Sequence, residues 1–165
     1  MTGTDRRQWR HARSHTLVVA CSDGRLQEAT DAFLANELGL TEYDRFYMPG
    51  GGGALAASGR DFIRAQQLRR ECQYLVELHD VDRVLLLFHG PSGGGPTDAA
   101  CADYRRKFSG ASAAAIHARQ ARDAAELLER RDEWAGSAAV SAYYCEVGPT
   151  LGITFLAMEP HESDG

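Results

Sequence analysis

The chain has 165 residues, of which 44% are hydrophobic and 25% are charged, and this balance is typical of a globular domain and not of a disordered chain. Its length predicts one domain, and its net charge of −5 argues against a nucleic-acid-binding surface. No apolar run approaches the ~20 residues that a membrane span needs, and the N-terminus lacks the apolar core of a secretory signal. We therefore expect a cytoplasmic protein without a nucleic-acid or membrane partner.

Short apolar runs alternate with amphipathic stretches along the chain, which predicts alternating strands and helices. The first half is expected to hold strands at 15–21, 45–48 and 83–89, and helices at 26–38 and 55–78. The second half is expected to hold a polar helical segment at 98–108, an alanine-rich helix at 112–134, and strands at 139–147 and 152–158. Because the last two runs are joined by a Gly-Pro-Thr turn, we expect them to pair as a hairpin at the sheet edge.

This alternation predicts an α/β fold, with a mainly parallel central sheet of about four strands, an antiparallel edge strand, and helices on both faces. We expect a single domain over residues 15–160, an N-terminal arm over 1–14 and a polar tail over 161–165. The arm is basic around Trp9. Two interpretations of the arm remain open, a helix that packs on a partner subunit and a solvated arm.

Chemically distinctive segments follow three of the expected strands. They are Cys21-Ser22-Asp23-Gly24-Arg25, the glycine run at 49–53, and the segment 89–95 that begins with His89. In sheets of this kind, ligands bind beyond the carboxyl ends of the strands. The three segments are therefore expected to meet around one cleft.

Cys21 and His89 offer a sulfur and a nitrogen donor, which zinc prefers. Asp23 either serves as a third ligand or pairs with Arg25, which would keep the carboxylate ionised as a hydrogen-bond acceptor. The alternative is that Cys21 is a small buried residue and His89 a hydrogen-bonded strand-end histidine. Cys72 and Cys145 fall within an expected helix and strand, so we expect both in the core.

The segment Cys21-Ser22-Asp23-Gly24-Arg25 resembles the Cys-x-Asp-x-Arg motif of the β-class carbonic anhydrases. The resemblance continues through a glycine-containing segment at 48–53 and a long helix. It then covers His89-Gly90-Pro91-Ser92-Gly93, where that family has His-x-x-Cys-Gly, and a closing pair of strands at 143–156. The resemblance covers roughly residues 17–156 and implies the carbonic anhydrase fold.

The resemblance implies a zinc ion with Cys21 and His89 as ligands, beside a catalytic dyad of Asp23 and Arg25. The third ligand departs from the family pattern, because Ser92 occupies the position of the second cysteine and a neutral hydroxyl is a poor zinc ligand. The alternatives are Asp23 as the third ligand, Cys101 reaching back across the glycine loop, and no metal. We take Cys21, His89 and Asp23 as the candidate ligand set.

The glycine runs admit an anion site, because backbone N–H groups at strand-to-helix turns attract anions. Its candidate residues are Gly50, Gly51, Ser92 and Gly93. The competing interpretation is that these glycines permit tight turns and close packing.

The expected function is that of a carbonic-anhydrase-like protein with an altered zinc site. We expect weak or diverged hydration or hydrolysis of a small substrate such as CO2, with bicarbonate as the related anion. The alternative is a non-catalytic module on the same fold that binds a small anion or a protein. The resemblance and the Trp9 arm also imply a homodimer or a dimer-based oligomer.

Overall fold

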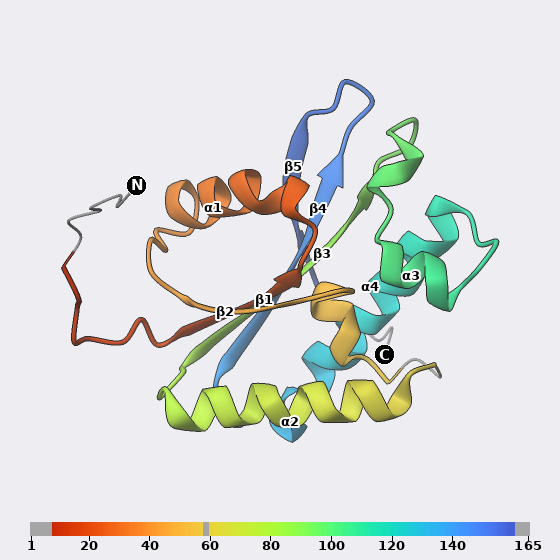
Figure 1. Ribbon diagram of the computed structural model, residues 1–165. Coiled ribbons are helices and arrows are strands. Elements are labelled where there is room, and N and C mark those ends of the chain that lie inside the picture. Colours follow the sequence, from red (N-terminus) through yellow and green to blue (C-terminus); the bar gives the residue numbers. More distant parts are fainter. Residues whose placement is uncertain (1–7, 58–59, 161–165) are drawn as a thin grey trace, which may run out of the picture.

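A computed structural model describes residues 8–57 and 60–160 (Figure 1). Its sheet has the strand order β2-β1-β3-β4-β5. The strands are β1 (Thr16–Cys21), β2 (Asp44–Met48), β3 (Arg83–Pro91), β4 (Ala139–Val147) and β5 (Ile153–Met158). The first four strands pair in parallel, and β5 pairs antiparallel with β4 at the edge. The expected α/β architecture with an antiparallel edge strand is therefore confirmed.

Helices cover both faces of the sheet. Helix α1 (Gln27–Asn36) lies on one face, and α2 (Phe62–Leu78) and α4 (Ala113–Glu129) lie on the other (Figure 1). Alternate residues of β1 pack against the helices on opposite faces of the sheet, because successive side chains of a strand point to opposite faces. Val18 packs in the cluster under α1, and Val19 packs in the larger cluster under α2 and α4.

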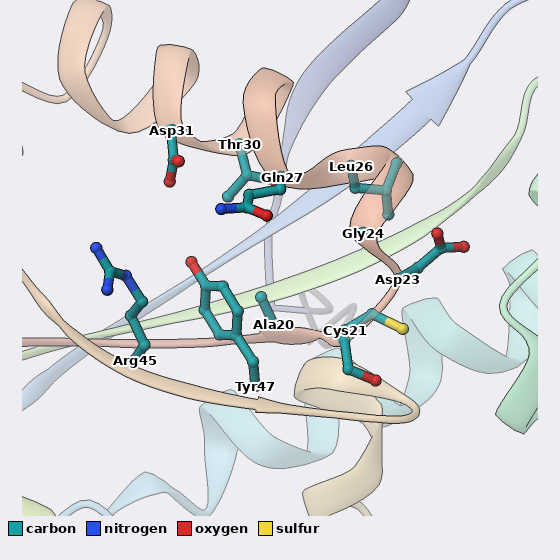
Figure 2. Close-up of a pocket in the computed structure, with 11 residues that line it drawn as sticks. Ala20, Cys21, Asp23, Gly24, Leu26, Gln27, Thr30, Asp31, Arg45 and Tyr47 are labelled. Atoms are coloured by element: carbon teal, nitrogen blue, oxygen red, sulfur yellow. The ribbon is translucent and has the colours of Figure 1, made fainter. Parts of the chain in front are cut away.

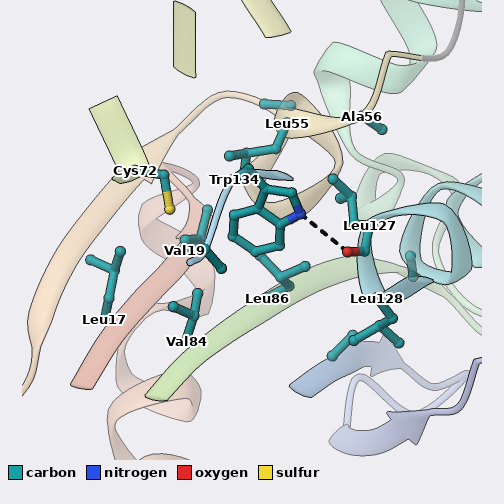
Figure 3. Close-up of a cluster of buried hydrophobic side chains, with 14 of the residues drawn as sticks. Leu17, Val19, Leu55, Ala56, Cys72, Val84, Leu86, Leu127, Leu128 and Trp134 are labelled. Carbon is teal, nitrogen blue, oxygen red and sulfur yellow. Dashed lines mark hydrogen bonds between the residues drawn. The ribbon is translucent and has the colours of Figure 1, made fainter. Parts of the chain in front are cut away.

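The larger cluster is centred on apolar side chains of β1 and β3 and on the end of the alanine-rich segment (Figure 3). Trp134 is 1% exposed, and its indole Nε1 donates a hydrogen bond to the carbonyl of Leu127 at 3.1 Å. This bond satisfies the one polar group of a side chain that is otherwise surrounded by Val19, Leu55 and Leu86 (Figure 3). The C-terminal end of α4 is thereby fixed against the sheet.

Three of the expected helices have different bounds in the structure. The helix expected at 112–134 is α4, which ends at Glu129 and is followed by a separate 3-10 helix, η4 (Arg131–Glu133). The helix expected at 55–78 begins at Phe62, and the residues before it form a buried 3-10 helix, η2 (Gly51–Leu55). Consecutive glycines disfavour an α-helix, and here they are needed for close approach: a Cβ on Gly51 would lie 2.7 Å from the backbone nitrogen of Cys21. The segment expected at 98–108 divides into the 3-10 helix η3 (Thr97–Ala99) and the helix α3 (Ala102–Lys107).

The described part of the N-terminal arm, residues 8–14, forms neither helix nor strand. Trp9 is 85% exposed there. The rest of the arm and the tail at 161–165 lie outside the described residues, so both interpretations of the arm as a whole remain untested. Within the described ranges, no helix has both the length and the apolar character to cross a bilayer.

Candidate metal centre

Three potential metal ligands converge at the carboxyl edge of the sheet. Cys21 ends β1, His89 lies near the end of the neighbouring strand β3, and Cys101 immediately precedes α3. One donor atom from each residue lies within 4.8 Å of the other two. The proximity of Cys21 and His89 was expected from their strand ends, since parallel neighbours end at the same edge. Cys101 is brought to them by the turn through η3.

The imidazole of His89 is oriented by its surroundings. His89 is 4% exposed, and its Nδ1 lies 3.0 Å from the carbonyl oxygen of Ala99. A carbonyl only accepts, so Nδ1 donates to it, and Nε2 is left as the nitrogen available to a metal. Within the described residues, that buried Nε2 has no hydrogen-bond partner. An orphaned imidazole nitrogen with its other nitrogen held by a carbonyl is the arrangement that metal-ligating histidines adopt.

The pKa values of the two cysteines in the cluster are shifted in opposite directions. Hydrogen bonding from the Cys101 thiol lowers the pKa of Cys21, burial opposes this, and His89 lowers it further. The pKa of Cys101 is raised, because Cys21 and burial both disfavour its thiolate. In the metal-free protein, the surroundings therefore favour the thiolate at Cys21 and the thiol at Cys101. A cation beside both sulfurs would favour loss of the Cys101 proton as well, so the donor chemistry fits a metal such as zinc.

Asp23 and Arg25 form a close ion pair beside this cluster. Arg25 donates through Nε to Oδ1 at 3.0 Å and through Nη2 to Oδ2 at 2.7 Å. This bonding lowers the pKa of Asp23 to about 2, despite the opposing effect of burial. Arg25 also reaches the carboxylate of Asp98 at 3.1 Å, and so links the segment after β1 to η3. Asp23 is therefore ionised and held in place by Arg25.

A cavity of about 300 Å³ opens beside the ion pair. Its polar lining includes Asp23, Arg25 and His89, and Leu26, Val147 and Ile153 are among its apolar walls. Of the residues expected around one cleft, Cys21 does not line this cavity but lies in the ligand cluster with His89. The space is suited to a small molecule with little polarity.

A second pocket lies on the α1 side of β1 (Figure 2). The hydroxyl of Tyr47 points toward α1, whereas the sulfur of Cys21 points away from Tyr47 (Figure 2). Burial raises the pKa of Tyr47, so its hydroxyl is neutral. Cys21 thus borders this pocket, and its sulfur is a member of the ligand cluster.

The four residues of the expected anion site have different surroundings. Gly50 and Gly51 are buried, with φ values of 96° and 54°. A Cβ on Gly50 would lie 2.6 Å from Oδ2 of Asp103, so close packing accounts for this position. Ser92 and Gly93 lie in the turn after β3, where the Ser92 hydroxyl contacts the carbonyl of Gly93 at 3.5 Å. Close packing therefore accounts for Gly50 and Gly51, whereas no atom lies within 4 Å of the Cβ position of Gly93.

The remaining cysteines are in the core, as expected. Cys72 is fully buried in α2, and Cys145 is 2% exposed in β4. Burial raises the pKa of both thiols to about 12, so they stay protonated. Of the four cysteines, Cys21 and Cys101 are the two in the ligand cluster.

No protein-family model and no curated protein sequence matches this chain. Among solved structures, the chain is similar to carbonic anhydrase from Streptococcus mutans, with a TM-score of 0.47, 14% identity, and coverage of 90% of this chain and 83% of that one. It is also similar to β-carbonic anhydrase isoform I from Trichomonas vaginalis, with a TM-score of 0.46, 14% identity, and coverage of 94% and 88%. A mutant β-carbonic anhydrase from Aspergillus fumigatus gives a TM-score of 0.49 at 11% identity, with coverage of 96% and 95%. At these identities, the site has to be judged on the geometry of this chain.

Proposed function

We propose that this chain is a carbonic-anhydrase-like zinc protein that interconverts CO2 and bicarbonate. The observation that carries the proposal is the cluster of Cys21, His89 and Cys101, in which the buried Nε2 of His89 has no partner. The ion pair of Asp23 and Arg25 adjoins it. The proposed reaction, interconversion of CO2 and bicarbonate, comes from the resemblance of the segment 21–25 to the carbonic anhydrase motif.

Two sulfurs and one imidazole nitrogen form a donor set that zinc prefers. Typical Zn–S and Zn–N bonds are about 2.3 Å and 2.0–2.1 Å, which agrees with three donors that all lie within 4.8 Å of one another. Three protein ligands leave a fourth position for water. When bound, zinc would lower the pKa of that water toward neutrality.

In this proposal, Asp23 accepts a hydrogen bond from the reacting water and so orients it. Arg25 occupies both carboxylate oxygens of Asp23 and fixes its direction. Because the pKa of Asp23 is about 2, the carboxylate remains an acceptor throughout the neutral range. Asp98 in turn restrains Arg25 from the opposite side.

The cavity walls formed by Leu26, Val147 and Ile153 would receive CO2, which is small and uncharged. Bicarbonate, the charged product, would be formed at the polar end of the cavity near Asp23 and Arg25. An apolar approach and a polar reaction site therefore suit this substrate and product pair.

We assign the third ligand position to Cys101. Its sulfur lies in the cluster, whereas both oxygens of Asp23 already accept hydrogen bonds from Arg25. Ser92 hydrogen-bonds within its own turn. With Cys101 as ligand, Asp23 is free to serve in the dyad, and the replacement at position 92 does not by itself remove the zinc site.

Metal analysis of the protein purified without chelator tests the assignment, together with stopped-flow CO2 hydration. We expect about one zinc per chain and measurable hydration in the wild type. Cys101→Ala should lose most of the zinc and the activity. Cys72→Ala is the matched control, because it removes a buried thiol outside the cluster and should retain the metal.

Asp23→Asn separates the dyad role from the ligand role. With Asp23 in the dyad, the variant keeps its zinc and loses CO2 hydration. Loss of zinc in this variant, with retention in Cys101→Ala, would show that Asp23 is the third ligand. A wild type that carries no metal and binds bicarbonate without hydrating CO2 would instead support the non-catalytic alternative.

A further inference from the structure

Asp103 is an unusual residue at the beginning of α3. Its side chain is only 3% exposed, and its Oδ2 lies 3.0 Å from Nζ of Lys107, which is equally buried. Arg106 contributes Nη2 at 2.9 Å from Oδ1, and Arg64 of α2 contributes Nη1 at 3.4 Å. A buried carboxylate with three cationic neighbours is therefore placed two residues after Cys101.

A net gain in the stability of the fold does not account for such a buried ion pair. Removing two charges from water costs several kcal/mol per ion, and their attraction often does no more than offset that cost. Buried ion pairs are better attested as devices that fix one arrangement among several. The arrangement that Asp103 and Lys107 would fix is the position of the first turn of α3.

Asp103 joins three elements. Lys107 lies one helical turn further along α3, and Arg64 extends from α2 and also donates to the carbonyl of Pro49 at 2.7 Å. The carboxylate itself sits against Gly50, where a Cβ would lie 2.6 Å from Oδ2. The start of α3 is thus clamped onto the glycine run and α2 at one point.

Cys101 depends on that clamp for its position. It is the residue immediately before α3, and its carbonyl accepts the first helical bond, from the nitrogen of Arg105 at 3.0 Å. Cys21 and His89 stand on strands, whereas Cys101 follows a turn and precedes a helix of six residues. Movement of the first turn would therefore carry the sulfur of Cys101 out of reach of the other two donors.

We propose that Asp103 is the positioning residue of the third ligand: its ion pair with Lys107, seated against Gly50, holds Cys101 beside Cys21 and His89. The role in metal binding rests on the proposed function. The placement of the two sulfurs is a property of the metal-free protein and is testable without a metal.

The first measurement uses phenylarsine oxide, which condenses with two neighbouring thiols, forming two As–S bonds and releasing water, while arsenic remains trivalent. Metal-free wild type should bind one equivalent, detected by intact mass, and Cys21→Ser should bind none. Asp103→Asn, which keeps the side-chain shape and removes the charge, should bind at least about tenfold more weakly. Asp44→Asn is the matched control, because Asp44 pairs with His79 at 2.6 Å at the start of β2, and it should bind like wild type.

The second measurement is zinc affinity, by competition with a chromophoric chelator. Loss of an outer residue that orients a ligand typically weakens metal binding by about 10–100-fold, and we expect this range for Asp103→Asn. In the Co²⁺-substituted protein, the sulfur-to-metal charge-transfer absorption should fall toward that of a single thiolate. A merely structural role would lower the melting temperature and leave this absorption unchanged.

Lys107→Met provides a second variant should Asp103→Asn fail to fold, because Arg64 and Arg106 still neutralise Asp103. It should weaken arsenical and zinc binding in the same direction, to a smaller extent. Wild-type arsenical and zinc binding in folded Asp103→Asn or Lys107→Met would overturn the proposal. A wild type that binds the arsenical through Cys21 and Cys101 but takes up no zinc would refute the proposed function and leave the placement by Asp103 supported.

Discussion

Cys21 is half-buried and accessible, and its thiolate is stabilised by the Cys101 thiol and by His89. A thiolate, not a thiol, is the nucleophile toward alkylating reagents. Because the pKa of Cys21 is lowered, the metal-free protein should be alkylated at Cys21 by iodoacetamide at nearly the same rate at pH 6 and pH 8. An ordinary thiol would slow by about tenfold for each pH unit below its pKa.

The matched variant is Cys101→Ala, which removes the largest influence that lowers the pKa of Cys21. Its alkylation rate should regain a dependence on pH, measured by peptide mass spectrometry. Cys72 and Cys145 serve as internal controls and should stay unmodified, because both are buried and protonated. A Cys21 rate that falls about tenfold from pH 8 to pH 7 and again to pH 6 in the wild type would contradict a lowered pKa of Cys21.

Ser92 gives a second prediction at this scale. From the sequence, Ser92→Cys is expected to restore a ligand and raise zinc occupancy. With Cys101 as the third ligand, the site does not need a thiol at position 92, and the backbone N–H of Ser92 is held in its turn by the carbonyl of Val147 at 3.0 Å. Zinc content and affinity in Ser92→Cys should therefore equal those of the wild type, measured by metal analysis and chelator competition. Tighter zinc binding would show that position 92 reaches the metal.

A site residue can be predicted from the sequence when it lies on a strand, and much less well when it follows a turn. Cys21 and His89 end apolar strands, and the adjacency of parallel strands makes their meeting predictable. Cys101 is ranked below Asp23 as third ligand by the sequence, because its place depends on the turn through η3 and on contacts of α3. The contacts that bring Cys101 to the site join residues far apart in the sequence: Arg25 bonds to Asp98, and His89 bonds to Ala99, both in the turn before Cys101.

At the level of elements, η2 and α3 are fitted to each other. Tyr104 of α3 is fully buried, donates to Asp123 of α4 at 2.6 Å, and lies against Gly53. A Cβ at position 53 would lie 2.5 Å from a ring carbon of Tyr104, so the ring and helix must shift. The amphipathic pattern around residue 55 predicts an α-helix there, because a local pattern carries no information about the contact between Gly53 and Tyr104. The observed 3-10 helix η2 accommodates that contact.

Gly53→Ala should therefore destabilise the protein, by about 1–3 kcal/mol if the cost is that of ordinary overpacking. The measurement is thermal unfolding followed by circular dichroism. Gly93→Ala is the control, since no atom lies within 4 Å of its Cβ position and its melting temperature should not change beyond a degree or so. Equal stability of the two variants would show that α3 is free to move away from η2.

At the level of the whole molecule, we predict a dimer. Trp9 is 85% exposed on an arm without regular structure over residues 8–14, and a large exposed aromatic side chain is suited to a protein interface. Light scattering at micromolar concentration should give about twice the chain mass of 18.0 kDa. Removal of residues 1–13, or Trp9→Ala, should shift the equilibrium toward the monomer. A wild-type mass equal to that of one chain would contradict the prediction.

The two tryptophans of the chain lie in opposite environments. Trp134 is 1% exposed and hydrogen-bonded in the core, whereas Trp9 is almost fully exposed on the arm. Their fluorescence should consequently consist of a blue-shifted component from Trp134 and a red-shifted component from Trp9 that iodide quenches. Unfolding would shift only the first component, while burial of the arm in a dimer would protect only the second. The native chain thus contains separate optical reporters of its folding and of its assembly.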